Sequence, residues 1–172
     1  MLNIVKKAFA LSALTFALST TAFAQDKPKV AFVPQLIGIP YFNAMEAGGK
    51  RAAEELGVEF IYSGPVDTNP VDQLQIVQNL IDQGVSAVSV SVLDASAIAP
   101  VVQAAKAKGA KLFTSDSDAP DSGRAVYVAQ ATDEGLGTTI VDELVKRVGD
   151  DAKIGIVSGE ATASNLNAWI GF

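Results

Sequence analysis

Residues 29–57 read KVAFVPQLIGIPYFNAMEAGGKRAAEELG, and this stretch predicts the fold. Its beginning, residues 30–33, is a short continuous apolar run, which is typical of a strand buried on both faces of a parallel sheet. Pro40 then stands where the first residue of a helix tolerates a missing N–H, and apolar residues recur behind it at three- and four-residue spacing. Gly57 suits the end of that helix. We therefore predict a strand, a loop and a helix.

The loop of this unit, residues 35–39, has no charged side chain. In open α/β sheets, ligands bind beyond the carboxyl ends of the strands, which is where this loop is expected to lie. It contains the amide of Gln35 and is followed by the rings of Tyr41 and Phe42. An amide beside aromatic rings favours a neutral, hydroxyl-bearing ligand with an apolar face.

The composition of the 172 residues excludes several kinds of site. The chain has no cysteine and no histidine, which excludes disulfides, Cys/His metal sites and nucleophile–histidine pairs. Chemistry by carboxylates, lysine or oxygen ligands stays open, and no cofactor is expected. The formal net charge is −6 and there is no basic stripe, which argues against nucleic acid as a partner.

Residues 1–24 have the pattern of a secretory signal peptide. Two lysines precede an apolar run at residues 8–18, and an Ala-Phe-Ala cleavage motif ends the segment. A transmembrane helix needs roughly 20 apolar residues, and this run is shorter. We predict cleavage before Gln25, export to the periplasm and no membrane insertion after cleavage.

After Gln25 the chain alternates between predicted strands and helices. Asn69 and Pro70 suit the N-cap and first residue of a second helix, and Gly84 and Gly109 suit helix ends. Further strands are predicted at residues 58–61, 87–92 and 111–114. The predicted fold class is therefore α/β, with an open parallel sheet and helices on both faces.

The alternation changes after residue 114. Residues 115–124 are too few for a crossover helix, since a crossover between parallel strands takes a dozen or more residues. Residues 125–128 nevertheless read as a strand. We therefore predict a border here, with an N-terminal α/β lobe at residues 25–124 and the start of a second, similar lobe at residues 125–172.

The second lobe begins with a predicted helix that Thr132 caps. Its inward face is predicted to consist of Leu136, Ile140, Leu144 and Val148. A strand at residues 153–158 and a helix near Ser164 follow. The last residues, NAWIGF, are apolar and lack a helix-end signal, so we expect the sequence to be the first part of a longer protein, truncated within this lobe.

The signal peptide is followed, in order, by AFVPQLIGIPYFNAMEAGGKRAAEELG, QNLIDQGVSAVSVS, KGAKLFTSDSD and SNLNAWIGF. Together these segments resemble the type I periplasmic sugar-binding proteins of ABC importers, and the nearest branch is that of the rhamnose- and autoinducer-2-binding proteins. The resemblance covers nearly all of residues 25–172. It implies two lobes that close on one small sugar-like ligand, a monomer without enzymatic activity, and the importer's permease subunits as partners.

The resemblance implies a ligand-binding role for Asp116, which follows a predicted strand and matches the family's binding aspartate. The alternative is that Asp116, like Asp118 and Asp121, only forms a turn. Phe42 matches the family's ring-stacking aromatic, yet its spacing also fits the core of its helix. Tyr41 is interpreted as structural.

Gln35 stands where the named branch commonly has a lysine, so the ligand of neither relative can be transferred to this chain. Asn165 and Asn167 fall where the family's second lobe offers polar side chains, and an amide suits a vicinal diol because it both accepts and donates. Helix capping by Asn165 or Ser164 is the alternative. Gln130, at the end of a predicted strand, is a further candidate.

Four other functions stay open as alternatives. A nucleotide-binding α/β enzyme needs G-x-G-x-x-G after its first strand, where residues 34–40 contain only Gly38. A sugar-responsive repressor shares the two-lobed fold, but it begins with a helix-turn-helix instead of an export signal. The others are a hydrolase that uses Asp116 and Asp118, and a truncated binding protein without function.

Overall fold

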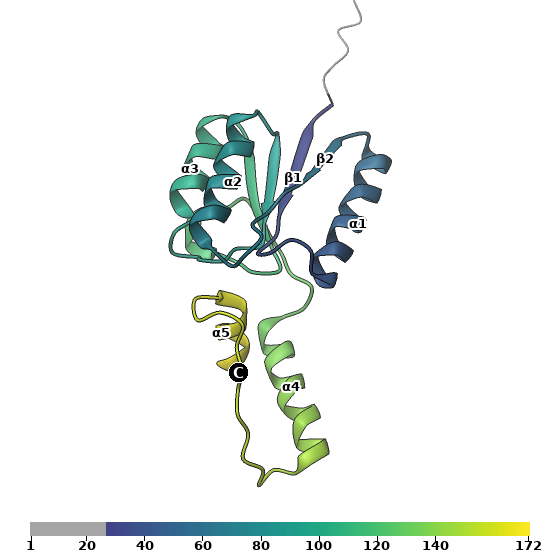
Figure 1. Cartoon of the computed structure of the whole chain (residues 1–172), viewed down its shortest axis with the longest axis vertical. Coiled ribbons are helices and arrows are strands. Elements are labelled where there is room, and N and C mark those ends of the chain that lie inside the picture. The colour runs from purple at the N-terminus through teal and green to yellow at the C-terminus, as the bar shows by residue number, and fades with distance from the viewer. Residues whose placement is uncertain (1–26) are drawn as a thin grey trace, which may run out of the picture.

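Five parallel strands form one sheet in the computed structural model, which describes residues 27–172 (Figure 1). They are β1 (Lys29–Val33), β2 (Glu59–Tyr62), β3 (Ala87–Val90), β4 (Lys111–Ser115) and β5 (Tyr127–Val128), in the order β2-β1-β3-β4-β5. Every neighbouring pair is parallel. The signal peptide predicted at residues 1–24 lies outside the described residues.

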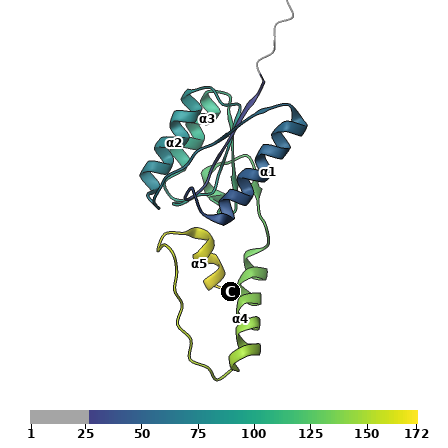
Figure 2. The same ribbon diagram turned by 45° about the vertical axis from the view of Figure 1, so that its right-hand side comes forward.

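Helices cover both faces of this sheet, which confirms the predicted fold class. α1 (Pro40–Leu56) lies on one face, and α2 (Pro70–Asp82) and α3 (Ala99–Ala107) lie side by side on the other (Figures 1 and 2). The main core lies between the sheet and α2 and α3, and it includes Ala31, Val33, Val77, Leu80, Ile81, Val88, Val90, Val102 and Leu112. None of the helices formed by residues 27–172 is long and apolar enough to cross a membrane.

Local capping residues set the helix ends, as the sequence predicts. The side chain of Asn69 accepts a hydrogen bond of 3.0 Å from the Val71 N–H at the start of α2. Thr132 accepts one of 3.1 Å from the Gly135 N–H at the start of α4 (Asp133–Val148). Gly57 follows α1 with a φ of 69°, a conformation that glycine adopts without steric cost.

α1 approaches the sheet closely at Gly49. A Cβ added to Gly49 would stand 2.4 Å from Cζ of Phe60, so any larger residue there would force the Phe60 ring to move. Beyond this contact α1 covers only part of its face of the sheet, and an apolar hollow of about 310 Å³ extends from α1 to Phe113 and Val128. The α1 face is therefore less completely packed than the face under α2 and α3.

β5 belongs to the same sheet as the other strands. Tyr127 pairs with Thr114, and Val128 pairs with Ser115. The connection from β4 contains one 3₁₀ turn, Pro120–Ser122, so this parallel neighbour is reached without a crossover α-helix. Because the strand completes the first sheet, we move the boundary that we propose between the two lobes from residue 124 to a position after Val128.

The remaining helices, α4 and α5 (Ser164–Ile170), pack against each other beyond the carboxyl edge of the sheet (Figures 1 and 2). The strand predicted at residues 153–158 is not formed, because within residues 27–172 this segment has no neighbouring strand to pair with. The predicted inward face of α4 is corrected for the same reason. Ile140 and Val148 are exposed and Leu136 and Leu144 only half-buried, since no sheet covers them.

Candidate functional site

Asp116 stands one residue after β4 in an unusual backbone conformation. Its φ is 66°, and among residues 27–172 it is the one non-glycine residue with a positive φ. A positive φ is uncommon for a residue with a Cβ, and the conformation persists only where neighbours hold it. The residue is 5% exposed, so its carboxylate needs partners within the protein.

Uncharged groups supply those partners. Tyr41 Oη, in the first turn of α1, donates to Asp116 Oδ1 at 2.8 Å, and Ser91 Oγ, just after β3, donates to Oδ2 at 2.5 Å. Gln130 Nε2 makes a longer contact of 3.4 Å with Oδ1. None of the ion pairs formed by the described residues includes Asp116. Its hydrogen-bond partners are therefore hydroxyl and amide groups alone.

The main chain of Asp116 is also bonded at both of its polar groups. Its N–H donates to the Val128 carbonyl at 3.2 Å, and its carbonyl accepts a hydrogen bond of 2.9 Å from Tyr127 Oη. Both partners lie on β5. The strand that ends the sheet thus fixes the residue that the sequence singles out for ligand binding.

Asp118, in contrast to Asp116, forms an ion pair with a neighbouring side chain. Arg124 Nη2 donates to Asp118 Oδ2 at 2.6 Å, Arg124 Nε donates to Oδ1, and the Thr114 hydroxyl donates to the same oxygen. Burial raises the pKa of Asp118, but the hydrogen bonds from Arg124 and Thr114 outweigh burial and hold the pKa below its usual value. This ion pair closes the loop between β4 and β5 and compensates the charge of Asp118 within the protein.

Gln73, on the buried face of α2, joins the carboxyl ends of two strands. Its Nε2 donates to the carbonyls of Pro34 and Ser91, at 3.0 and 2.7 Å, and its Oε1 accepts from the Leu93 N–H at 3.0 Å. The residue is 1% exposed. Sequence reasoning missed it, although an amide four residues before the buried Val77 signals a polar group on an apolar helix face.

Gln35 lies at the same edge of the sheet as Asp116. Its Nε2 donates to the Val92 carbonyl at 2.9 Å, and Ser117 Oγ donates to that carbonyl at 2.7 Å. Phe42, by contrast, is buried, and its ring centroid lies 6.2 Å from that of Phe32. The geometry of Phe42 agrees with the core alternative, whereas Tyr41, interpreted as structural, donates to Asp116.

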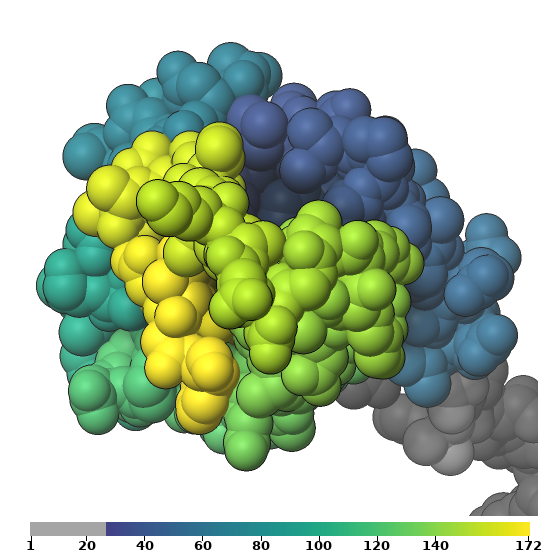
Figure 3. All heavy atoms as spheres, turned by 90° about the horizontal axis from the view of Figure 1, so that it is seen from below, coloured from purple at the N-terminus to yellow at the C-terminus, as the bar shows by residue number. Residues whose placement is uncertain are grey.

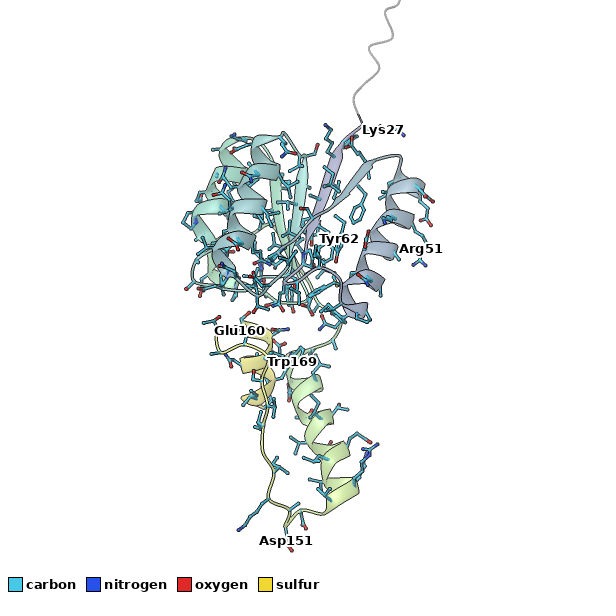
Figure 4. All side chains as sticks on the ribbon, viewed as in Figure 1. Lys27, Arg51, Tyr62, Asp151, Glu160 and Trp169 are labelled. Atoms are coloured by element: carbon cyan, nitrogen blue, oxygen red, sulfur yellow. The ribbon has the colours of Figure 1, made fainter. Side chains whose placement is uncertain are left out.

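The N-terminal end of α5 contacts the loop after β4. The hydroxyl oxygens of Ser117 and Ser164 are 2.9 Å apart, and Ser164 Oγ donates to the Asp118 carbonyl at 3.1 Å. Figure 4 shows side chains gathered at this edge of the sheet, above the labelled Glu160 and Trp169. Seen from below, the α4–α5 part lies over the edge and leaves α1 uncovered beside it (Figure 3).

The two candidate asparagines of α5 differ. Asn165 is 8% exposed, and its Oδ1 has no hydrogen-bond partner among the described residues. The N-cap of α5 is Ala163, without a side-chain cap, so Asn165 does not have the capping role that was its alternative. Asn167 is exposed and its Nδ2 donates to the Ala161 carbonyl at 2.9 Å, in the loop just before α5.

The structure thus brings Asp116, Tyr41, Ser91 and Gln35 together at one edge of the sheet and sets α5 with Asn165 against the loop after β4. Asn167 instead bonds to Ala161, in the loop just before α5. The Tyr41 and Ser91 hydroxyls were missed from the sequence. The ligand roles of Asp116, Phe42, Gln35, Asn165 and Asn167 stay predictions.

Comparison with known proteins gives a consistent result. The family described as periplasmic binding protein domain matches residues 30–171. The ribose import binding protein RbsB of Escherichia coli (strain K12) is 26% identical over 164 residues, which are 95% of this chain and 54% of that protein. A D-ribose/D-allose-binding protein of Pseudomonas aeruginosa is 29% identical over 148 residues, which are 81% of this chain and 46% of that protein.

Solved structures of similar fold include three with a bound ligand. A solute-binding protein of Clostridium phytofermentas with L-rhamnose has a TM-score of 0.81 and 27% identity, over 84% of this chain and 45% of its own. A solute-binding protein of Burkholderia graminis with D-arabinose has a TM-score of 0.78 and 32% identity, over 84% of this chain and 50% of its own. LsrB from Clostridium saccharobutylicum with AI-2 has a TM-score of 0.73 and 28% identity, over 83% of this chain and 46% of its own. The chain spans about half the length of the relatives that it matches.

Proposed function

Because this chain belongs to the family of periplasmic binding protein domains, we propose that it is the solute-binding component of an ABC-type importer and binds a small neutral sugar. The sugar contacts the carboxyl edge of the sheet on one side and the segment that begins after Val128 on the other. The importer's permease subunits are the proposed partners. The protein performs no chemistry on the ligand.

The observation that supports this proposal best is the chemistry around Asp116. Its buried carboxylate is bonded by hydroxyl and amide groups alone, and the neighbouring cation, Arg124, is engaged by Asp118. A sugar hydroxyl can bond to such a carboxylate, and a hydrogen bond to a charged acceptor contributes about 1.5–3 kcal/mol. An anionic ligand would meet an uncompensated negative charge. The names of similar proteins mention ribose, L-rhamnose and D-arabinose, which are neutral sugars.

Asn165 supports a second wall for the ligand. A buried acceptor without a partner is rare in folded proteins, and a ligand hydroxyl near Asn165 Oδ1 would satisfy it. Gln35 lies at the same edge and is an uncharged amide, so it adds no charge to the site. Phe42 is retained as an aromatic candidate on the first wall, next to Tyr41, whose ring centroid lies 5.1 Å away.

The proposal includes export. A signal peptide at residues 1–24 and the family assignment both support a periplasmic location after cleavage before Gln25. A neutral ligand agrees with the surroundings of Asp116, which takes part in none of the ion pairs of residues 27–172.

Calorimetric titration tests the proposal. The protein from Gln25 onward, and any longer natural product of its gene, are titrated with D-ribose, L-rhamnose, D-arabinose and autoinducer-2, with D-ribose 5-phosphate as the anionic control. We expect one neutral ligand to bind, and Asp116→Ala to weaken that binding about 10- to 100-fold. The matched control is Asp121→Ala, an exposed aspartate of the same loop that should bind normally.

Three outcomes contradict the proposal. Binding of none of the neutral ligands by either form overturns the sugar-binding function. Preference for the phosphorylated sugar overturns the neutral site. Unchanged affinity in Asp116→Ala shows that Asp116 does not bind the ligand and only forms a turn.

A further inference from the structure

The hydroxyl of Tyr127 contacts the main chain of Asp116 and not its carboxylate. Tyr127 Oη donates to the Asp116 carbonyl at 2.9 Å, from the strand that pairs with β4. Within residues 27–172 no backbone N–H donates to that carbonyl. The tyrosine therefore provides a hydrogen bond that the regular ladder of the sheet does not provide.

This hydrogen bond acts at the residue with the least favourable backbone of the chain described here. A φ of 66° is uncommon for a residue with a Cβ, and it persists only when surrounding contacts fix it. Asp116 needs this conformation because the chain turns sharply after β4, where the Ser117 N–H donates back to the Ser115 carbonyl at 2.8 Å. In this conformation the carboxylate accepts hydrogen bonds from Tyr41 and Ser91.

The ring of Tyr127 is itself held in place. The guanidinium carbon of Arg124 lies 5.8 Å from the ring centroid, and Arg124 is fixed by its ion pair with Asp118. Burial, together with the charges of Asp133, Asp118 and Asp116, raises the pKa of Tyr127, so its phenol stays a donor through the neutral range. Arg124 thus fixes the ring of Tyr127, and the hydroxyl of Tyr127 fixes the main chain of Asp116.

We propose that Tyr127 is a positioning residue: it keeps Asp116 in its tight turn with positive φ and so directs the carboxylate toward the ligand. The backbone part of this inference rests on the geometry alone. The ligand part rests on the proposed function. Tyr127 does not contact the ligand in this account and acts through Asp116.

Nuclear magnetic resonance tests the backbone part without a ligand. The backbone chemical shifts of Asp116 report whether φ is positive, and they are compared in the wild type, Tyr127→Phe and Tyr62→Phe. Tyr62 is the matched control, because its buried hydroxyl has no partner among the described residues and its removal breaks no hydrogen bond. We expect the shifts that report a positive φ to be lost in Tyr127→Phe and kept in Tyr62→Phe. Retention of these shifts in Tyr127→Phe overturns the proposal.

A stability cycle covers the case in which Tyr127→Phe folds too poorly for these spectra. Glycine adopts a positive φ without help, so Asp116→Gly should not depend on Tyr127. We expect Tyr127→Phe to lower the melting temperature in the wild type and to have clearly less effect in the Asp116→Gly background. Equal effects in both backgrounds show that Tyr127 stabilises the fold in general, which contradicts positioning.

A binding cycle tests the ligand part, with whichever of D-ribose, L-rhamnose and D-arabinose binds the wild type. We expect Tyr127→Phe to weaken binding about tenfold and to have no further effect once Asp116 is alanine. Additive losses contradict an action through Asp116. If neither these sugars nor autoinducer-2 binds the wild type, the proposed function fails, while the spectra and the stability cycle still decide the backbone part.

Discussion

Tyr41 and Asp116, 75 positions apart in the sequence, are joined by a hydrogen bond of 2.8 Å from the phenol Oη to the carboxylate Oδ1. The contact connects the first turn of α1 with the loop after β4. It fixes one oxygen of the carboxylate while the other accepts from Ser91. Two hydroxyls from different elements thus hold a buried charge that has no cation as a partner among the described ion pairs.

The first prediction concerns the ionisation of Tyr41. Burial, and then the hydrogen bond to Asp116 and its charge, raise the pKa of Tyr41 far above the ordinary 10.0. A raised pKa in the folded state contributes stability below pH 10, and that contribution is lost as the pH rises above 10. In a titration followed by tyrosinate absorbance, we expect the tyrosines to ionise at a higher pH in the folded than in the unfolded protein. Tyr41→Phe should remove the part of the titration that occurs at the highest pH. An unchanged titration in Tyr41→Phe contradicts this assignment.

Much of the fold follows from local signals in the sequence. Asn69 begins a helix by accepting a hydrogen bond from an N–H two residues later, and Gly57 ends one by adopting a positive φ. Both effects act within a single turn, so they depend little on the surrounding structure. The end of β4 placed Asp116 at the carboxyl edge for a similar reason. The segment at residues 153–158 shows the limit of local signals, because an apolar run forms a strand only beside a neighbour.

The contacts of the site are not local, and the sequence did not reveal them. Ser91 is 25 positions from Asp116, and the two meet because β3 and β4 are neighbours in the sheet. The alternation of strands and helices does not determine this order. The spacing of apolar residues in α1 distinguishes a buried face from an exposed one, but it does not show where the end of a long side chain such as Tyr41 lies.

The second prediction concerns Gln73. Gln73→Leu leaves the carbonyls of Pro34 and Ser91 and the N–H of Leu93 without their partner in the core. An unsatisfied buried group costs about 1–3 kcal/mol, so we expect urea denaturation to show a loss of about 2–4 kcal/mol. Gln75→Leu, an exposed substitution on the same helix, is the matched control and should change stability by less than about 0.5 kcal/mol. Equal losses in the two variants contradict the role of Gln73.

The third prediction concerns the ion pair of Asp118 and Arg124. The pKa of Asp118 lies below its usual 3.8 in the folded state, so the pair contributes stability above pH 3.8, and this contribution is lost as the pH falls through the lower folded value. We expect Asp118→Asn to be less stable than the wild type at pH 7 by about 1.5–3 kcal/mol. The difference should shrink on acidification. Asp121→Asn, which removes no ion pair of the described residues, should follow the wild type throughout. A difference independent of pH would show that the charge of Asp118 is unimportant.

The fourth prediction concerns export. Residues 1–24 combine two lysines, an apolar run and an Ala-Phe-Ala motif, which together predict cleavage before Gln25. We expect N-terminal sequencing of the protein from a periplasmic extract to begin at Gln25. A substitution of Ala24 by a bulky residue should retain the uncleaved precursor, because signal cleavage requires small residues there. An intact Met1 on protein recovered from the cytosol contradicts this prediction.

The last prediction concerns the apolar surface between α4 and α5. A hollow of about 330 Å³ lies between these helices and residues 154–159, and its lining is mainly apolar. Val157, in this lining, is 99% exposed, and Ile156 beside it is also exposed. Exposed apolar surface of this kind promotes association between molecules, and nothing among the described residues covers it.

Replacing both side chains by polar ones should therefore improve solubility without weakening the sheet. In Ile156→Thr/Val157→Lys we expect less light scattering on storage and lower fluorescence of an apolar dye, at an unchanged melting temperature. Val66→Lys is the matched control, because Val66 is 81% exposed but lies outside the hollow, so this substitution adds the same charge elsewhere. If Val66→Lys improves solubility equally, net charge and not the hollow is responsible. A lower melting temperature in the double variant would show that residues 154–159 pack more tightly in solution than their exposure indicates.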